Sequence, residues 1–440
     1  MKGMTFLDPT VLAILGIVTV IAMLALGVNI GMAMMLVGFV GYAISVNLNA
    51  AYGVLRTEPV TQASSFVLTV IPLFIMMGNF AFASGMSAGL YNAGNKWLSK
   101  LPGGLACATI AACAAFGAIC GSTTATAATM GVVAIPEMQK HGYASSLATG
   151  SVSVGGSLGI MIPPSSCFIV YGIAAEENIG RLFAAGILPG IVIAVFCIIV
   201  IVVHVKIKPE LATPPLPCTW RERFASLKGL IDVLILFIGI FVLMFSGVFT
   251  ISEAAAAGAF LAMIICAAKR KLSWKTFLSV MGDSIKTTAM TYLIVIGAMV
   301  FGKFLAISKL PMTLATLVTS LEVSPYLVFT VIIIIYAVLG CLMDALPMVM
   351  LTVPIFLPVI MDLGFDKVWF GVIIVMVMML GVITPPVGLN CYVISGVAKD
   401  VPLQTIFKGA LPFTIALLAA IVVVTAFPQI ALVIPNLLYG

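Results

Sequence analysis

Two stretches of this sequence decide its fold: GGSLGIMIPPSS at residues 155–166 and GVITPPVGLN at residues 381–390. Each lies in an apolar run and carries two adjacent prolines with glycine upstream. Proline removes a backbone donor and disfavours helical geometry in the residue before it. Each pair is therefore expected to unwind a helix and free backbone carbonyls, which cannot face lipid. Carbonyls freed in this way can coordinate a cation, while the half-helix that follows presents its N-terminus to an anion.

The composition places the chain in a bilayer. Of its 440 residues, 62% are hydrophobic and only 8% are charged, whereas soluble domains carry about 25% charged residues. The apolar runs are continuous rather than alternating, so they predict membrane-spanning helices and not a β-barrel. The net charge of +6 comes from basic residues in short loops, so it does not indicate a nucleic-acid partner. The apolar run after residues 1–9 lacks a convincing cleavage site and is interpreted as a retained first helix.

An internal repeat relates the two proline pairs. The spacing that separates Pro163 from Pro385 also separates other matching residues: Pro136 and Pro358, Gly142 and Gly364, Gly159 and Gly381, Ser122 and Asp344. Each half is predicted to contain a re-entrant hairpin, at about 104–138 and 325–361, and a broken helix, at about 144–177 and 367–396. The hairpin arms, about 13–16 residues long, are short for a full crossing. Two breaks at matching positions favour binding sites over simple proline kinks.

The remaining apolar runs predict simple spans and interfacial helices. The spans are expected at about 10–28, 30–47, 66–84, 184–206, 229–247, 253–268, 285–307 and 407–427. Residues 87–100 and 270–277 are candidate interfacial amphipathic helices, which Trp97 and Trp274 would anchor at headgroup level.

The placement of lysine and arginine predicts the orientation. With both hairpins re-entrant, most of the 21 basic residues fall on one side, which the positive-inside rule makes cytoplasmic. The first half, 1–206, then starts outside and the second half, 229–440, starts inside, with 207–228 as a cytoplasmic linker. The expected fold is thus an all-α polytopic membrane protein with two inverted repeats, as in many secondary transporters. Both termini are predicted to be periplasmic, in the bacterial inner membrane.

Asp344 is the most informative charge in the sequence. It lies at the predicted tip of the second hairpin, where an ionisable group is costly and usually functional. It is a candidate to coordinate sodium, to bind a proton or to pair with Lys303, or else it is a water-exposed tip residue. Lys303 is a candidate substrate contact or a snorkelling side chain. The turn of the first hairpin, residues 120–124, offers hydroxyls and carbonyls, although small residues there also allow close helix packing.

Motifs for ATP use and for enzymatic chemistry are absent from the sequence. It contains neither a G-x-x-x-x-G-K-[ST] phosphate loop nor an H-E-x-x-H motif. The nine cysteines include no C-x-x-C and are interpreted as buried thiols rather than disulfides or metal ligands. Coupling to an ion gradient, with no cofactor, is therefore predicted. The alternatives are a stand-alone sodium–dicarboxylate symporter, an intramembrane enzyme and a channel.

Several motifs together resemble the large membrane subunit (DctM-like) of tripartite ATP-independent periplasmic (TRAP) transporters. They are Gly121-Ser122, Pro136-Glu137-Met138, His141-Gly142-Tyr143, LGIMIPPS at 158–165, Tyr171-Gly172, GILPG at 186–190 and TPPVG at 384–388. The resemblance covers essentially the whole chain. It implies a sodium-driven elevator importer of a small organic anion, such as a C4-dicarboxylate, a sialic or sugar acid, or a sulfonate. It also implies two partners, a separate small membrane subunit and a soluble periplasmic binding protein.

The same resemblance implies which residues act. Sodium would be held by carbonyls of the hairpins and broken helices: at a first site Gly117, Cys120, Gly159, Ile162 and Pro164, and at a second site Gly340, Gly381, Thr384 and Pro386. Substrate or ions would contact Ser122, Thr123, Ser165, Ser166 and Asp344. One departure concerns Cys120, which stands where related sequences often have serine. A role for that hydroxyl would pass to Ser122 or to the Cys120 carbonyl.

Overall fold

The computed structural model is built of α-helices, which confirms the expected fold class. It describes residues 8–214, 218–320 and 323–439, and these ranges contain no strand. Within them, six helices are long and apolar enough to cross a membrane, or up to seven if a bent pair counts as one span. The ends of the two predicted repeats, 1–7 and 440, and the middle of the predicted linker, 215–217, lie outside the described residues.

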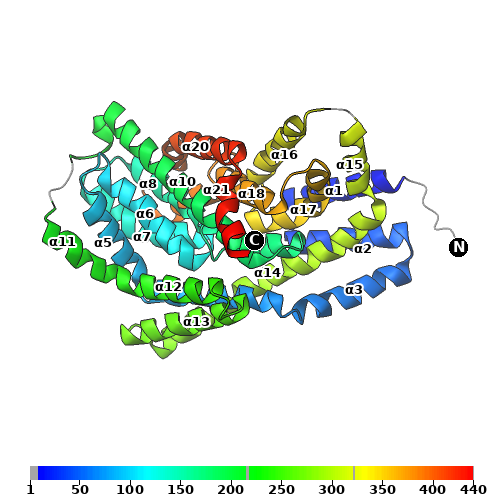
Figure 1. The fold of residues 1–440 in the computed structure, drawn as a ribbon, viewed down its shortest axis with the longest axis horizontal. Helices are drawn as coiled ribbons and strands as arrows, with labels where there is room; N and C mark the ends of the chain where they lie inside the picture. Colours follow the sequence, from blue (N-terminus) through cyan, green and yellow to red (C-terminus); the bar gives the residue numbers. More distant parts are fainter. Residues whose placement is uncertain (1–7, 215–217, 321–322, 440) are drawn as a thin grey trace.

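One group of helices packs around the long α14 (Trp274–Ser308). Helices α1 (Pro9–Ala25), α2 (Ile30–Ser45), α3 (Leu48–Ala63) and α4 (Val70–Ala83) contact α14 directly. The group continues with α13 (Ile251–Ala268), which packs on α4, and α12 (Ile231–Phe245), which packs on α13. Helices α2 and α14 run side by side (Figure 1), and their backbones touch. A methyl group at Gly297 would overlap the carbonyl oxygen of Gly31. Small residues of this kind let helices approach closely in lipid, where no hydrophobic effect drives them together.

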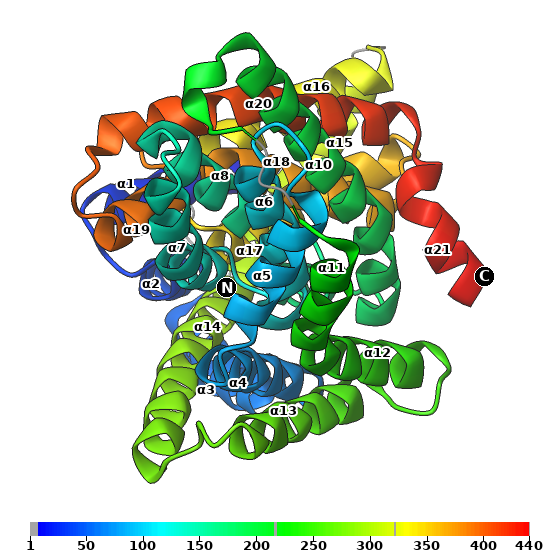
Figure 2. The ribbon, with the colours of Figure 1, turned by 90° about the vertical axis from the view of Figure 1, so that its left-hand side faces the viewer.

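The second group holds the hairpins and the broken helices. The first half contributes α6 (Gly104–Cys120), α7 (Thr123–Lys140), α8 (Ser145–Ser157), α9 (Ser166–Ala174) and α10 (Ile179–Ile207). The second half contributes α16 (Pro325–Gly340), α17 (Ala345–Asp362), α18 (Lys367–Gly381), α19 (Leu389–Val397) and α20 (Leu403–Ala426). The hairpins are α6–α7 and α16–α17, and the broken helices are α8–α9 and α18–α19. Figure 2 shows α6, α8, α10, α18 and α20 gathered above α3, α4, α13 and α14.

Four shorter helices flank these groups. The predicted interfacial helix at 87–100 is confirmed as a helix, α5 (Met86–Leu98), and it packs against α6. Helix α15 (Leu310–Ser320) packs against α17, and α21 (Gln429–Tyr439) against α10. The linker contains α11 (Trp220–Ser226), which lies on α5.

The helix bounds repeat along the chain. When residue numbers of the first half are shifted by the spacing between the two proline pairs, α7 falls on 345–362, which are the bounds of α17. By the same shift α8 falls on 367–379, which lies within α18. In the same way α1, α2 and α5 fall on α12, α13 and α15, while α4 falls within α14 and α3 overlaps its first part. The repeated order of elements is therefore visible in the fold. The opposite orientation of the two halves stays a prediction.

The structure differs from the sequence-based expectation at four helices and one span. Helices α3, α11, α15 and α21 are not predicted, and α14 runs unbroken for 35 residues where a break between 270–277 and 285–307 is expected. That expected break is wrong, because Asp283 and Lys286 lie on the exposed face of α14 and interrupt the hydropathy without interrupting the helix. In the first half the equivalent stretch is divided into α3 and α4, which meet at 57°.

Gly297→Val should destabilise the protein. A branched side chain at this position would overlap the backbone of α2, and overpacking of this kind costs about 1–3 kcal/mol. The matched control is Gly302→Val on the same helix, where an added Cβ would meet nothing within 4 Å. Thermal unfolding of the detergent-solubilised variants, followed by tryptophan fluorescence, measures the difference. Equal midpoints for the two variants would contradict the contact.

Candidate functional site at the paired helix breaks

The first break lies directly against the tip of the first hairpin. Helix α8 ends at Ser157 and α9 begins at Ser166, with a 3-10 turn over Leu158–Ile160 between them. A methyl group at Gly159 would come within 2.5 Å of the Ser122 carbonyl oxygen and 2.7 Å of Thr126 Oγ1. One at Gly117 would lie 2.7 Å from the Gly159 Cα atom. The predicted ion residues Gly117 and Gly159 are thus neighbours, and only glycine allows their backbones to approach this closely.

Two serines at the start of α9 bond carbonyls of the hairpin tip and of the break. Ser166 Oγ donates a hydrogen bond to the Gly121 carbonyl at 2.7 Å, and the Ser166 amide lies 3.4 Å from the same oxygen. Gly121 has φ of +63°, a left-handed conformation that favours glycine. Ser165 caps α9, and its Oγ donates to the Ile160 carbonyl at 2.5 Å. The hydroxyls therefore satisfy carbonyls that the proline pair and the turn leave free.

The second break meets the second hairpin in the same way. A methyl group at Gly381 would overlap the backbone of Gly340. After the prolines, the Val387 amide donates to the Cys341 carbonyl at 3.3 Å. Thr384 Oγ1 donates to the Leu380 carbonyl at 2.6 Å, one turn back in the same helix, and its oxygen keeps free lone pairs. Both Pro-Pro peptide bonds are cis. The predicted residues Gly340, Gly381 and Thr384 thus belong to one junction.

A cavity of about 240 Å³ lies between the hairpin tips and helices α4 and α14. Among the predicted residues, its lining includes Cys120, Ser122, Pro164, Ser166 and Asp344. Helix α14 contributes Thr287 and Thr291 to the opposite wall. The starts of α7, α9 and α17 all border the cavity, and Ser122 and Asp344 are the N-cap residues of α7 and α17. Helix N-termini favour anions, whereas the Asp344 carboxylate favours a cation, so this cavity can take both.

The other predicted side chains lie outside this lining. Thr123 and Ser165 are buried. Lys303 lies on the side of α14 that faces α3, and its Nζ is 3.6 Å from Glu58 Oε1. The predicted pair of Lys303 with Asp344 is therefore not formed, and Lys303 does not border the cavity. The other two ion candidates, Ile162 and Pro386, lie in the unwound stretches between the half-helices.

Two buried side-chain oxygens at the breaks are without a hydrogen-bond partner in the described part of the chain: Thr126 Oγ1 and Asn390 Oδ1. Thr126 faces Gly159, while Asn390 Nδ2 donates to the Ser153 carbonyl at 3.0 Å and ties the start of α19 to α8. An unpaired buried oxygen costs about 1–3 kcal/mol unless a cation or water meets it. Neither residue is in the predicted set. The signal in the sequence is weak: each is a polar residue four positions after a motif residue, Ser122 or Pro386.

The chain matches, over residues 17–430, the family model described as "Tripartite ATP-independent periplasmic transporter, DctM component". The chain belongs to this TRAP transporter family. The resemblance seen in the sequence is thereby confirmed. The protein is the large permease component of a TRAP transporter, a multi-pass membrane protein and not an enzyme.

Similar proteins include three TRAP permeases. The permease is 35% identical over 372 residues to the C4-dicarboxylate TRAP transporter large permease protein DctM of Pseudomonas aeruginosa, covering 84% of this chain and 86% of that one. It is 31% identical to the sialic acid TRAP transporter large permease protein SiaM of Vibrio cholerae, covering 86% and 88%. It is 34% identical to the isethionate TRAP transporter permease protein DctMQ of Oleidesulfovibrio alaskensis, covering 84% of this chain and 58% of that longer one.

Two solved transporters share the fold of the permease. They are the Alcanivorax borkumensis YdaH transporter, with a TM-score of 0.59 over 86% of this chain and 89% of that one, and Neisseria gonorrhoeae MtrF, with a TM-score of 0.59 over 96% and 95%. Each is 16% identical in sequence, so the likeness concerns the fold alone.

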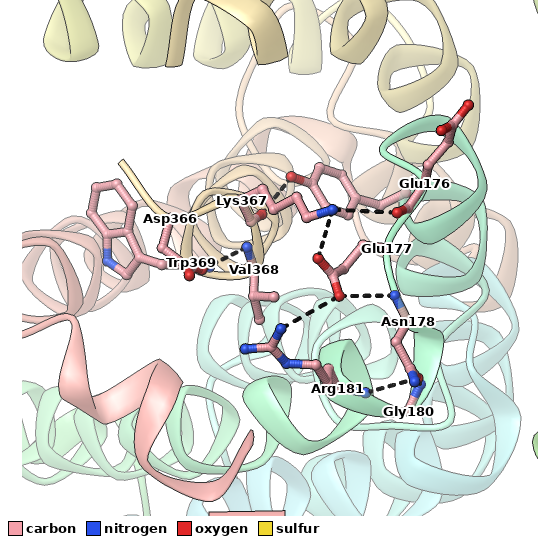
Figure 3. Close-up of polar contacts among 10 residues, drawn as sticks. Glu176, Glu177, Asn178, Gly180, Arg181, Asp366, Lys367, Val368 and Trp369 are labelled. Atoms are coloured by element: carbon pink, nitrogen blue, oxygen red, sulfur yellow. Dashed lines mark hydrogen bonds and ion pairs between the residues drawn. The ribbon is translucent and has the colours of Figure 1, made fainter. Parts of the chain in front are cut away.

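A charged clamp joins the two broken helices at the end of the permease where α9 stops and α18 starts (Figure 3). The Glu177 side chain is only 6% exposed, and its carboxylate lies 3.0 Å from Lys367 Nζ and 3.8 Å from Arg181 Nη1. Lys367 Nζ also donates to the Glu176 carbonyl at 3.3 Å, and the Tyr171 hydroxyl donates to the Lys367 carbonyl at 2.6 Å. One carboxylate thereby fixes the start of α18 to the end of α9 within the group of helices that holds the hairpins.

Glu177→Gln should lower the thermal stability of the permease, because it removes the carboxylate that Lys367 and Arg181 share. A mostly buried carboxylate bonded to a cation contributes more than an exposed one, and contacting charges typically couple by about 0.5–3 kcal/mol. A double-mutant cycle of Glu177→Gln with Lys367→Met, measured by thermal unfolding, should show that coupling. Glu176→Gln is the matched control, because the Glu176 side chain is exposed and only its backbone carbonyl contacts Lys367. Additive effects in the cycle, or an equal loss in the control, would contradict the clamp.

Proposed function

We propose that this permease imports a small organic anion together with sodium ions. It receives the anion from a periplasmic binding protein and works beside a small membrane subunit in the bacterial inner membrane, with both termini periplasmic. The observation that carries the proposal is one cavity lined by both hairpin tips and the first proline break and bordered by three helix starts, with the second break packed on the second hairpin. The substrates named for similar permeases, C4-dicarboxylates, sialic acid, isethionate and 2,3-diketo-L-gulonate, are all organic anions and support that class.

In this proposal each junction between a break and a hairpin binds one sodium ion through backbone oxygens. Hard cations prefer carbonyl, hydroxyl and carboxylate oxygens. The first ion would be held by Gly117, Cys120, Gly159, Ile162 and Pro164, and the second by Gly340, Gly381, Thr384 and Pro386. Thr126 Oγ1 and Asn390 Oδ1 are further candidate ligands because both are buried and unpartnered among the described residues.

The bound cations then make the cavity receptive to an anion. Asp344 is exposed at the hairpin tip and lines the cavity, and a positive ion beside it would offset its charge. The carboxylate or sulfonate of the substrate then lies at the starts of α7 and α9, beside Ser122 and Ser166. The group of helices that contains the hairpins carries ions and anion together past the group built on α14.

Sodium-driven uptake is the direct test. Proteoliposomes that contain the permease, its small membrane subunit and its binding protein, loaded with the anion that the binding protein selects, should accumulate that anion only with an inward sodium gradient. A potassium gradient of equal size is the control. Equal uptake in sodium and potassium would refute the coupling ion, and uptake by the permease without either partner would favour a stand-alone symporter.

Asp344→Asn should raise the sodium concentration needed for half-maximal uptake. Charge-assisted contacts contribute about 1.5–3 kcal/mol, so uptake at limiting sodium should fall about tenfold or more. Asp362→Asn is the matched control, because it neutralises an exposed carboxylate at the other end of the same helix, α17. An unchanged sodium dependence, with only the pH dependence lost, would assign Asp344 to a proton instead.

A further inference from the structure

We infer that the permease binds an anionic phospholipid in the groove between α5, α6 and the turn Leu227–Leu230. The groove has a volume of about 550 Å³. Its lining is apolar and includes Leu90, Ala93, Trp97, Ala112, Leu227 and Leu230. Small residues on α5 and α6 leave a channel that the large side chains around it do not fill. A groove lined in this way, on a protein surrounded by lipid, fits an acyl chain.

A buried arginine supplies the headgroup partner. Arg223 is only 7% exposed, and its Nε and Nη2 atoms have no hydrogen-bond partner among the described residues. It lies one helical turn before Leu227, so it is next to the groove lining along the linker segment without being part of that lining. Burial of a guanidinium without hydrogen-bond partners is costly, and a phosphate accepts its donors in two parallel bonds. Charge and geometry therefore both favour a phosphodiester at the end of the groove.

The neighbouring carboxylate is already engaged and does not neutralise Arg223. Glu222 accepts from the amide and the hydroxyl of Thr219, at 2.9 and 3.1 Å, in the cap of α11. Its other oxygen lies 3.9 Å from Lys96 Nζ on α5. Lys228, next to Leu227 of the lining, is exposed. The mouth of the groove is thus cationic, which selects an anionic headgroup over a zwitterionic one.

Aromatic rings mark the depth at which the headgroup would lie. Trp97 of α5 meets Phe224 edge-on with ring centroids 6.1 Å apart, and Trp220 stacks on Phe224 at 6.3 Å. The Arg223 guanidinium lies over the Trp220 ring, 5.0 Å from its centroid. Tryptophan prefers the headgroup level of a bilayer. Figure 2 shows α11 beside α5, at the end of α12, so the aromatic cluster and the basic residues occupy one edge of the molecule.

The position of the groove gives the lipid a mechanical role. Helix α5 follows α4 of the group around α14 and precedes α6 of the first hairpin. The acyl chain would therefore fill space at the joint between the two helix groups. This inference does not depend on the coupling ion, because lipid binding is measured without transport.

Native mass spectrometry of the full-length permease, purified in mild detergent and incubated with phosphatidylglycerol or phosphatidylethanolamine, tests the inference. Wild type should retain phosphatidylglycerol in preference to phosphatidylethanolamine. Arg223→Gln should lower the affinity for phosphatidylglycerol about tenfold, as expected for loss of a charge-assisted contact. Arg221→Gln removes the same charge two positions away on the same helix, from an exposed side chain, and should retain wild-type binding.

A second variant keeps the test decisive if Arg223→Gln fails to fold. Ala115→Phe places a ring in the groove and leaves Arg223 intact, so it should lower retention of the same lipid. The inference is overturned if Arg221→Gln and Arg223→Gln bind equally, if the two lipids bind wild type equally, or if Ala115→Phe folds and binds like wild type. A co-purifying polypeptide that excludes lipid from wild type would also overturn it.

Discussion

The backbone at the two proline breaks sets the constraint on which the rest of the fold depends. Inside a membrane, a carbonyl that loses its helical partner must find another within the protein, since lipid offers none. Each Pro-Pro pair removes two donors from its helix. Each break and its hairpin tip bond to each other instead: Ser166 Oγ donates to the Gly121 carbonyl in the first half, and the Val387 amide donates to the Cys341 carbonyl in the second. The tips of the two hairpins therefore lie against the two breaks.

Close approach of two backbones explains why glycines recur at these junctions. Gly117 and Gly159 touch in the first half, as Gly340 and Gly381 do in the second, and a side chain at Gly117, Gly159 or Gly381 would collide with backbone. The two junctions are alike in backbone but not in side chains. Ser122 caps α7 with a hydroxyl, whereas Asp344, its counterpart in the second half, begins α17 with a carboxylate. The two junctions thus have similar backbones, but only the second carries a charged side chain at the start of its helix.

The sequence predicts features that depend on local chemistry and repetition, and it does not predict contacts between distant segments. The proline pairs locate both breaks, and the spacing between the pairs locates the second hairpin from the first. Helix α3 is missed because its polar residues, among them Arg56 and Glu58, resemble a loop in a hydropathy profile. The pairing of Lys303 with Glu58, and of Glu177 with Lys367, joins residues far apart in the chain. No local pattern distinguishes these partners from Asp344, the partner considered for Lys303.

The clamp around Glu177 shows where the two halves stop being equivalent. The positions that correspond to Glu177 and Lys367 across the repeat are Lys399 and Ser145, which cannot form an ion pair. Beside Ser145 the helices instead meet through backbone: a methyl group at Gly409 would overlap the Ser146 carbonyl. One end of the group that carries the hairpins is therefore held by a charge pair and the other by close glycine packing. Both contacts hold the broken helices in place, but only the charge pair depends on the salt concentration and on ionisation. The repeat thus keeps its backbone symmetry at the cavity and loses it at its ends.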